Sequence, residues 1–260
     1  MTESDGELSE YLSRPLSQPD AATMATIGRG PIAPGNALPF AQLDRLLDPA
    51  PLAAEIGWCT LPDGVGYVAV RTPMPAVTGE MVEWWFDWHP RDPMRYRIWY
   101  PQAHSDNSLE LPQLPAVKAH WGAVHHPVED VGTGTVHARI AFKRPTELGF
   151  STDALDDITV ATIVCGEVGD DRRRVRHSAM AHVFLREGDG VVLRSQFWLG
   201  ALVRPYLPAP LASPAALALN NRLVRRLALP AGLPRALAGH CAEEYANLAV
   251  LLPELHARFG

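Results

Sequence analysis

The sequence predicts an α+β protein in which a run of antiparallel strands packs against one long C-terminal helix. From about residue 135 the apolar residues recur at every second position, as in TGTVHARIAFKRP. RRVRHSAMAHVFLREGDGVVLRSQFWLG has the pattern of two long strands joined by a turn at EGDG. From about residue 233 to residue 258 the apolar spacing is instead helical. A long helix across a curved sheet leaves a cavity between them, which suits an apolar ligand.

The N-terminal third predicts a smaller, mainly helical region. Residues 1–36 are rich in Ser, Asp, Gly and Pro and predict a flexible, loosely held arm. Residues 37–92 predict a small N-terminal helical part, with a short amphipathic helix at FAQLDRLLD and a strand at GVGYVAVRT. TGEMVEWWFDWHP predicts a further helix with Thr78 as its N-cap.

Residues 93–260 predict the main domain. In RYRIWYP the side chains of Tyr96, Ile98 and Tyr100 alternate, which predicts a strand, with His104 in the loop that follows. DDITVATIVCGEV predicts another strand, and SPAALALNNRLVRRLAL predicts a helix before the long closing one. The layout is therefore a helical front, a set of strands and a closing helix.

Composition excludes several classes of function. The 260 residues carry a net charge of -6 without a long basic block, which argues against nucleic acid or an anionic membrane surface as the partner. No apolar run reaches the roughly 18 residues of a spanning helix, and the acidic N-terminus is unlike a signal peptide. Three widely spaced cysteines without a CxxC motif predict reduced core thiols in a cytoplasmic protein. The motifs GxGxxG, GxxxxGK[ST] and GxSxG are absent, so nucleotide-binding and serine-hydrolase functions lose support.

The closing helix carries a polar pair on its apolar face. His240 and Glu244 lie in the same arc as Leu237, Leu248 and Leu251. Side chains at positions i and i+4 of a helix are about 6 Å apart at Cβ, so one metal ion can bridge them. A structural hydrogen bond is the alternative, because two ligands alone do not hold a catalytic ion.

Further ligands must come from upstream segments. His104 is one candidate, and the segment HWGAVHHPVED offers His120, His125, His126, Glu129 and Asp130. Spacing alone leaves the choice among these histidines open, and His126 is the hardest to exclude because it lies three residues from Glu129. Asn247 shares the helical arc of His240 and is a candidate for orienting a ligand.

Four segments resemble a known enzyme family. EWWFDWHP, RYRIWYPQAH, HHPVE and HCAEEYANLAVLLPEL, in this order over residues 80–258, are similar to 2,4-diacetylphloroglucinol hydrolases and the related phloretin hydrolase. The resemblance implies a Bet v 1-like helix-grip fold, in which residues 93–260 form the catalytic domain behind an added N-terminal helical part. It also implies cleavage of a carbon–carbon bond in a small aromatic acyl-ketone substrate, and it suggests a homodimer.

The resemblance further implies the site residues. A zinc ion is expected on His104, Glu129, His240 and Glu244, with Tyr96 and Asn107 binding the phenolic hydroxyls and His182 protonating the ring. An aromatic hydroxyl expected near SQFWLG is absent, since Phe197 and Trp198 stand there. Two alternatives stay open: a carrier of the same fold for a hydrophobic ligand, and a metalloenzyme with different Lewis-acid chemistry. Two His and two carboxylates also suit manganese or iron, so zinc follows from the resemblance alone.

Overall fold

A computed structural model describes residues 3–112, 116–155, 157–207, 214–216 and 218–260. Its main feature is an antiparallel sheet with the strand order β1-β2-β10-β9-β8-β7-β5-β4, to which β11 adds beside β9 and β6 beside β7, with β3 beyond β6. The strands are β1 (Gly57–Thr60), β2 (Gly66–Met74), β3 (His104–Asp106), β4 (Leu109–Glu110), β5 (Val124–His125), β6 (Val128–Asp130), β7 (Thr135–Lys143), β8 (Val160–Asp170), β9 (Val175–Glu187), β10 (Gly190–Leu199) and β11 (Arg204–Pro205).

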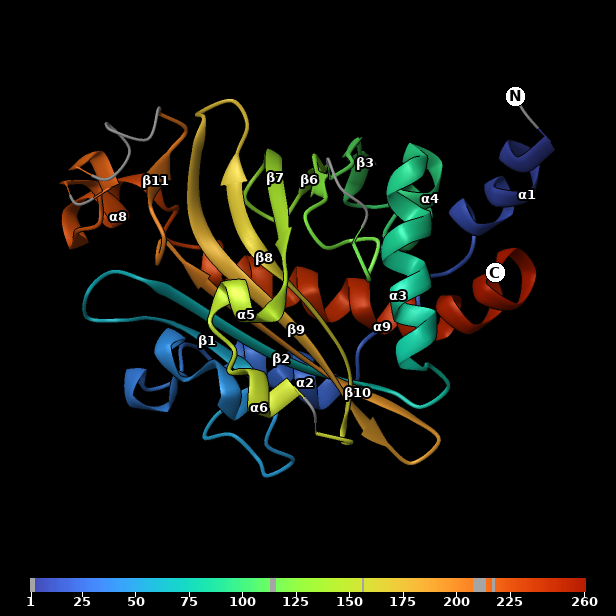
Figure 1. The fold of residues 1–260 in the computed structure, drawn as a ribbon, viewed down its shortest axis with the longest axis horizontal. Helices are drawn as coiled ribbons and strands as arrows, with labels where there is room; N and C mark the ends of the chain where they lie inside the picture. Colours follow the sequence, from blue (N-terminus) through green and yellow to red (C-terminus); the bar gives the residue numbers. More distant parts are fainter. Residues whose placement is uncertain (1–2, 113–115, 156, 208–213, 217) are drawn as a thin grey trace.

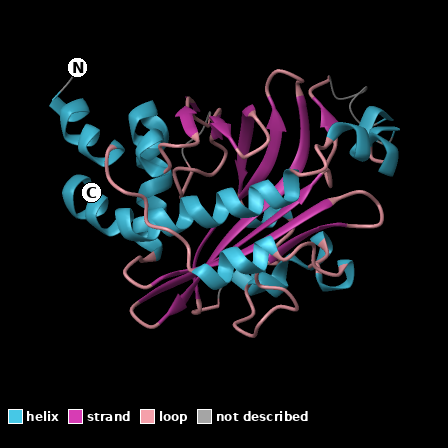
Figure 2. Cartoon of the chain, turned by 180° about the vertical axis from the view of Figure 1, so that it is seen from behind, coloured by secondary structure: helices cyan, strands magenta, loops and turns pink. Residues whose placement is uncertain are grey.

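The sheet curves around helix α9 (Leu233–Phe259), which crosses one of its faces (Figure 2). Helix α9 buries Cys241, Leu248 and Leu252 among residues of the inner face such as Val164 and Phe184. The opposite face of the sheet has its own apolar cluster, which is covered by residues 37–47 and by α5 (Pro145–Leu148). The predicted α+β helix-grip arrangement and the predicted closing helix are confirmed.

One predicted strand is a helix. RYRIWYP forms α4 (Pro93–Trp99), in which Pro93 takes the first position and the Asp92 carboxylate accepts a hydrogen bond from Met94 N at 2.8 Å. Proline is favourable at this position and aspartate is a preferred N-cap, so Asp92 and Pro93, which lie upstream of the segment, favour the helix. Helix α3 (Gly79–Trp88) precedes α4 and begins at Thr78, as the sequence predicts. His104 lies in the short strand β3 rather than in a loop.

The N-terminal residues do not form a loose arm. Helices α1 (Glu3–Leu12) and α2 (Ala21–Gly28) bury Leu8, Tyr11 and Ile27 in the same apolar cluster as α9. The Tyr11 hydroxyl donates to Glu254 of α9 at 2.9 Å, and both ends of the chain lie on the same side of the molecule (Figure 1). The composition of this segment is that of a disordered chain, but its few apolar residues are placed where a helix can bury them.

The predicted division at residues 37–92 also differs from the structure. Strands β1 and β2 lie in this range and belong to the main sheet, where β2 pairs with β10 over nine residues. The predicted helix at FAQLDRLLD is the 3₁₀ segment η2 (Phe40–Leu46), which follows η1 (Pro34–Asn36). This region is therefore part of the sheet and its cover, and not a separate helical unit.

The remaining elements are short. They are η3 (His89–Arg91), α6 (Thr152–Leu155) and α8 (Arg222–Ala228). Helix α8 begins at Asn221, which caps it, so the helix predicted over SPAALALNNRLVRRLAL is interrupted, and Ser213 and Leu217 of that prediction lie outside the described residues. Cys59, Cys165 and Cys241 are buried free thiols, as predicted. In the described part of the chain, every helix is too short or too polar to cross a bilayer.

Packing of α1 predicts that Leu8→Ala destabilises the protein. Leu8 is fully buried, so its truncation should lower the free energy of unfolding by about 2–4 kcal/mol. Urea titration of the variant measures the change. Leu223→Ala is the matched control, because Leu223 is 67% exposed and should cost no more than about 0.5 kcal/mol. Equal stability of the two variants would show that α1 does not pack as described.

Candidate metal centre

Two segments of the fold bring four polar side chains together. From α9, His240 and Glu244 face the protein interior, with His240 Nε2 3.8 Å from Glu244 Oε2. From the paired strands β3 and β6, His104 lies directly across from Glu129. His104 Nε2 is 3.5 Å from both Glu129 Oε2 and Glu244 Oε2, and His240 Nε2 is 3.8 Å from Glu129 Oε2. The four residues expected from the sequence therefore lie close together, with Glu129 and Glu244 each near both histidines.

The donor set fits a metal ion. One ligand atom each from His104, His240 and Glu244 lies within 4.8 Å of the others. His104 Nδ1 is 3.0 Å from the backbone oxygen of Tyr96, which can only accept, so Nδ1 carries the hydrogen and Nε2 keeps its lone pair. Within the described residues this buried Nε2 has no hydrogen-bond partner. A neutral imidazole nitrogen without a partner between two carboxylates is the arrangement that a divalent cation satisfies.

Electrostatics favour the same conclusion. Burial raises the pKa of Glu244 to about 8, and the nearby Glu129 adds to this rise, while His240 opposes it. Burial also lowers the pKa of His104, so this imidazole is neutral at pH 7. Without a cation, two carboxylates and two buried imidazoles are therefore poorly solvated.

Tyr96 contacts two of the candidate ligands. Its hydroxyl donates to Glu129 Oε2 at 2.5 Å, and its ring stacks on His104 at 3.9 Å between centroids with only 4° between the planes. Tyr96 thus orients one ligand through a hydrogen bond and another through stacking. The expected contact of its hydroxyl with a phenolic hydroxyl of a substrate stays a prediction.

The two other predicted site residues are buried outside this cluster. Asn107 follows β3 with 2% of its surface exposed, and neither atom of its amide group has a partner among the described residues. His182 lies in β9, with Nδ1 2.8 Å from Ser195 Oγ and its ring against Tyr245, the residue that follows Glu244. Phe197 packs against the edge of His182 at 5.4 Å between centroids.

Sequence reasoning missed the residues of α4 that support the site. Trp99 Nε1 donates to the backbone oxygen of Glu244 at 2.9 Å, and Asn247 Nδ2 donates to the backbone oxygen of Trp99 at 2.7 Å. Asn247 therefore connects α9 to α4 and does not contact a ligand directly, while its Oδ1 accepts from Ser17 N at 3.1 Å. The sequence does carry a signal for these contacts. Tyr96 and Trp99 are three residues apart, which places them on one face of a helix, and the N-cap residue Asp92 favours a helix over the strand that the alternation predicts.

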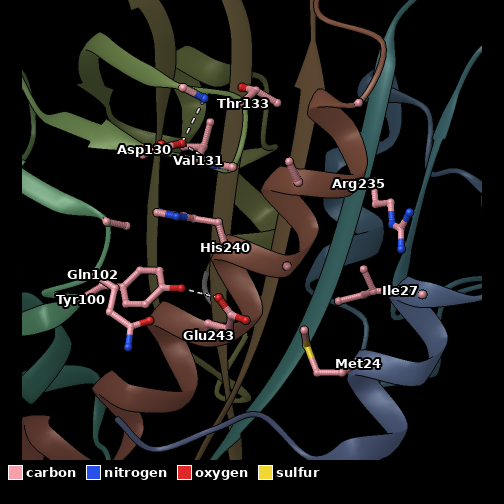
Figure 3. A pocket seen from close by; sticks show the side chains of 17 residues that line it. Met24, Ile27, Tyr100, Gln102, Asp130, Val131, Thr133, Arg235, His240 and Glu243 are labelled. Atoms are coloured by element: carbon pink, nitrogen blue, oxygen red, sulfur yellow. Dashed lines mark hydrogen bonds between the residues drawn. The ribbon is translucent and has the colours of Figure 1, made fainter. Parts of the chain in front are cut away.

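A surface pocket of about 770 Å³ reaches the site from outside. It lies over α9 between α2 and the loop that follows β6, and its lining includes His240, Tyr100 and Glu243 (Figure 3). The Tyr100 hydroxyl donates to Glu243, and its ring packs against His240 at 5.2 Å between centroids. The pocket thus differs in place from the predicted cavity between sheet and helix, and it ends at a candidate ligand.

The fold and the site define a helix-grip protein with a buried histidine–glutamate centre suited to a divalent metal. The chain belongs to the DAPG hydrolase family, because residues 38–257 match the family model described as the DAPG hydrolase PhiG domain. This match confirms the family that the sequence segments predicted.

Individual relatives agree with this assignment. The chain is 31% identical over 256 residues to phloretin hydrolase from Eubacterium ramulus, covering 95% of this chain and 88% of the relative. It is 32% identical over 244 residues to 2,4-diacetylphloroglucinol hydrolase from Pseudomonas protegens, covering 90% of this chain and 78% of the relative.

Among solved structures, Ara h 8.0201 is similar with a TM-score of 0.34 at 10% identity, over 68% of this chain and 97% of that one. Norcoclaurine synthase from Thalictrum flavum has a TM-score of 0.35 at 10% identity, over 76% and 90%.

The contact between Tyr96 and Glu129 predicts that Tyr96→Phe weakens metal binding. The variant keeps the ring on His104 but loses the hydrogen bond that holds Glu129, so we expect a metal affinity about 10-fold lower. Competition titration against a chromophoric chelator measures it. Tyr100→Phe is the control, since Tyr100 donates to Glu243, which is not a candidate ligand. A Tyr96→Phe variant that binds metal as tightly as Tyr100→Phe would contradict the supporting role of this hydroxyl.

Burial of His182 predicts a loss of stability in acid. Burial lowers its pKa to about 3, whereas the unfolded chain protonates this histidine near pH 6.5. The contribution to stability is complete above pH 6.5 and is lost as the pH falls toward 3, by up to about 1.4 kcal/mol per pH unit. Urea unfolding at pH 7 and 5.5 measures this slope in metal-free protein. The variant His182→Gln should lose less unfolding free energy between pH 7 and pH 5.5 than the wild type. An equal loss in both proteins would show that His182 is already protonated in the folded state.

Proposed function

We propose that this protein is a zinc-dependent hydrolase that cleaves the bond between a polyhydroxylated aromatic ring and an acyl group. The observation that carries the proposal is the convergence of His104, Glu129, His240 and Glu244 around a buried ring nitrogen without a partner. Membership in the DAPG hydrolase family supports the reaction class. The named activities of the relatives support an acylated phloroglucinol as the substrate.

The reaction is the reverse of a Claisen condensation. Water adds its oxygen to the acyl carbonyl carbon, and the bond from that carbon to the ring breaks. The bonding electron pair passes to the ring carbon, which takes up a proton, so the products are the free phenol and a carboxylic acid. The site must therefore activate a carbonyl and move one proton from the water to the ring.

The four clustered side chains would hold the zinc ion. When bound, zinc supplies Lewis-acid polarisation of the acyl carbonyl. The carboxylates of Glu129 and Glu244 balance its charge, and the bond from His104 Nδ1 to the Tyr96 backbone fixes the tautomer that presents Nε2. Tyr96 keeps Glu129 in position through its hydroxyl.

His182 is the proposed proton carrier. Its low pKa makes it neutral at pH 7, so it must first act as a base and can deliver a proton to the ring only after accepting one. The contact with Ser195 Oγ restricts the orientation of the imidazole. This order of events differs from that of a histidine already protonated before the substrate binds.

Phe197 and Trp198 stand where the resemblance implies an aromatic hydroxyl, and this difference bears on the substrate. Phe197 contacts His182 with an apolar edge, and the indole of Trp198 donates to the backbone oxygen of Leu38 at 2.8 Å. Position 197 therefore offers no hydroxyl beside His182. We propose a preference for a ring that carries no hydroxyl, or an alkyl group, on this side.

The test combines metal content with product analysis. Elemental mass spectrometry of the purified protein should find about one zinc per chain. Incubation with 2,4-diacetylphloroglucinol or phloretin should release the carboxylic acid and the deacylated phenol, which liquid chromatography separates. Glu244→Ala should lose the metal and at least 100-fold in kcat/KM, because it removes a ligand.

Glu243→Gln is the matched control for this variant. Glu243 neighbours Glu244 in the chain and bonds Tyr100, so its change should leave zinc content intact. A wild-type protein that holds no metal after reconstitution, or a Glu244→Ala variant with full activity, would rule out the metal-dependent reaction.

A further inference from the structure

A glycine of helix α9 lies in the wall of the pocket that reaches His240. Gly239 is inside the helix, in a backbone conformation that other residues adopt more favourably than glycine. A Cβ atom added at this position would meet no described atom within 4 Å, so close packing does not require a glycine either. Neither the backbone nor the packing of the described chain accounts for Gly239, whereas the pocket gives it a use, because a missing side chain keeps the pocket open.

Further glycines widen the same pocket. Gly28 of α2 and Gly232 before α9 also line it, and a Cβ atom at either position would project into open space among the described residues. The resulting volume of about 770 Å³ lies in the range of sites that bind small organic molecules. The pocket therefore has room for a substrate as well as for water.

Tyr100 covers the inner end of the pocket. Its ring lies against both histidines of the metal centre, at 5.2 Å from His240 and 5.8 Å from His104 between centroids. Its hydroxyl donates to Glu243, which lines the pocket three residues after His240. Figure 3 shows this bond beside the imidazole of His240. A hydrogen bond to one pocket residue therefore holds the ring that lies between the pocket and the candidate ligands.

A second pocket supplies a comparison. It has a volume of about 610 Å³ and lies between residues 17–23, the end of β2 and another flank of α9, where Ala242 and Ala246 line it. The four candidate ligands, all of which the structure describes, are not among its lining residues. Of these two pockets in the described part of the chain, the one beside Gly239 is therefore the one that leads to the metal centre.

We propose that the pocket is the route by which the substrate reaches the metal centre, and that Gly239 and Tyr100 determine the size of the molecule that passes. The acyl carbonyl must come close to the metal ligands to react, and the pocket connects the solvent with His240. Movement of the Tyr100 ring away from Glu243 then opens the path to His104. The catalytic role of the route rests on the proposed function, but access to the centre is measurable without turnover.

Removal of zinc by a chelator tests this access. Zinc-loaded protein is mixed with pyridylazoresorcinol at several concentrations, and the part of the rate that rises with chelator concentration measures entry of the chelator. Gly239→Phe should lower this part about 10-fold, because the added ring fills the pocket. Gly239→Ala should stay close to the wild type. Gly6→Phe is the matched control, since Gly6 lies in helix α1 and a Cβ atom there also meets no described atom within 4 Å.

Tyr100→Phe tests the inner end of the route. The variant keeps the ring but loses the bond to Glu243, so the chelator-dependent rate should rise about 3-fold, while the equilibrium affinity for zinc stays that of the wild type. A wild-type rate that does not depend on chelator concentration would overturn the proposal. Equal rates of Gly239→Phe and Gly6→Phe would also overturn it.

Urea unfolding separates access from a structural role of Gly239. Replacing a glycine inside a helix favours the helix, so Gly239→Phe should unfold at the same urea concentration as the wild type or a higher one. A clear loss of stability would mean that the space beside Gly239 is needed by the fold, and would overturn the proposal.

Histidine modification makes the outcome distinct from that of the proposed function. Diethyl pyrocarbonate acylates neutral imidazoles, and mass spectrometry measures the extent at each histidine of the metal-free protein. Gly239→Phe should slow the modification of His240 and leave that of His126 unchanged, because His126 is partly exposed outside the pocket. If this occurs but acylated phloroglucinols are not cleaved, the route holds and the hydrolase fails. If they are cleaved and Gly239→Phe is as active as the wild type, the hydrolase holds and the route fails.

Discussion

The requirement that the carboxylates of Glu129 and Glu244 both be accommodated beside one buried histidine constrains the elements around the site. Glu129 and Glu244 come from a strand and from a helix, and each lies 3.5 Å from the same nitrogen of His104. Burying one charged group without compensation is costly, and burying two beside each other is more so. The bulged strands, the end of α4 and the middle of α9 must therefore meet with little freedom. Tyr96, Trp99 and Asn247 supply the contacts that fix them.

This requirement explains why helix α4 is as important as the ligands. It contributes no ligand, yet its backbone orients His104, its Tyr96 holds Glu129, and its Trp99 contacts the backbone of Glu244. Three of the four candidate ligands, His104, Glu129 and Glu244, are thus held by hydrogen bonds to this one short helix. These supporting contacts run between protein groups alone, so they position the candidate ligands independently of any ion.

Much of this arrangement is predictable from the sequence, for identifiable reasons. The long amphipathic pattern of α9 places His240 and Glu244 on one face without reference to the rest of the chain, and the alternation in β7 to β10 is equally local. The apolar spacing of RYRIWYP fits both the two-residue repeat of a strand and the 3.6-residue repeat of a helix, so alternation alone predicts a strand. The N-cap at Asp92 decides for helix α4. The inward turn of Asn107 depends on a bulge, which no alternation reveals. Burial of α1 depends on surface that α4 and, through Tyr11 and Glu254, the C-terminal helix supply, so the composition of the segment alone does not predict it.

The contacts of helix α9 with segments far earlier in the chain have a consequence for synthesis. Tyr11 contacts Glu254, Ser17 contacts Asn247, and Trp99 contacts Glu244, which are separations of 243, 230 and 145 residues. During translation all the strands of the sheet are made before α9, so α9 cannot cover their inner face until it has been synthesised. Closing loops of this length makes folding slow compared with that of a protein built from local contacts. The inner apolar face of the sheet is therefore completed by a helix that is synthesised after every strand it covers.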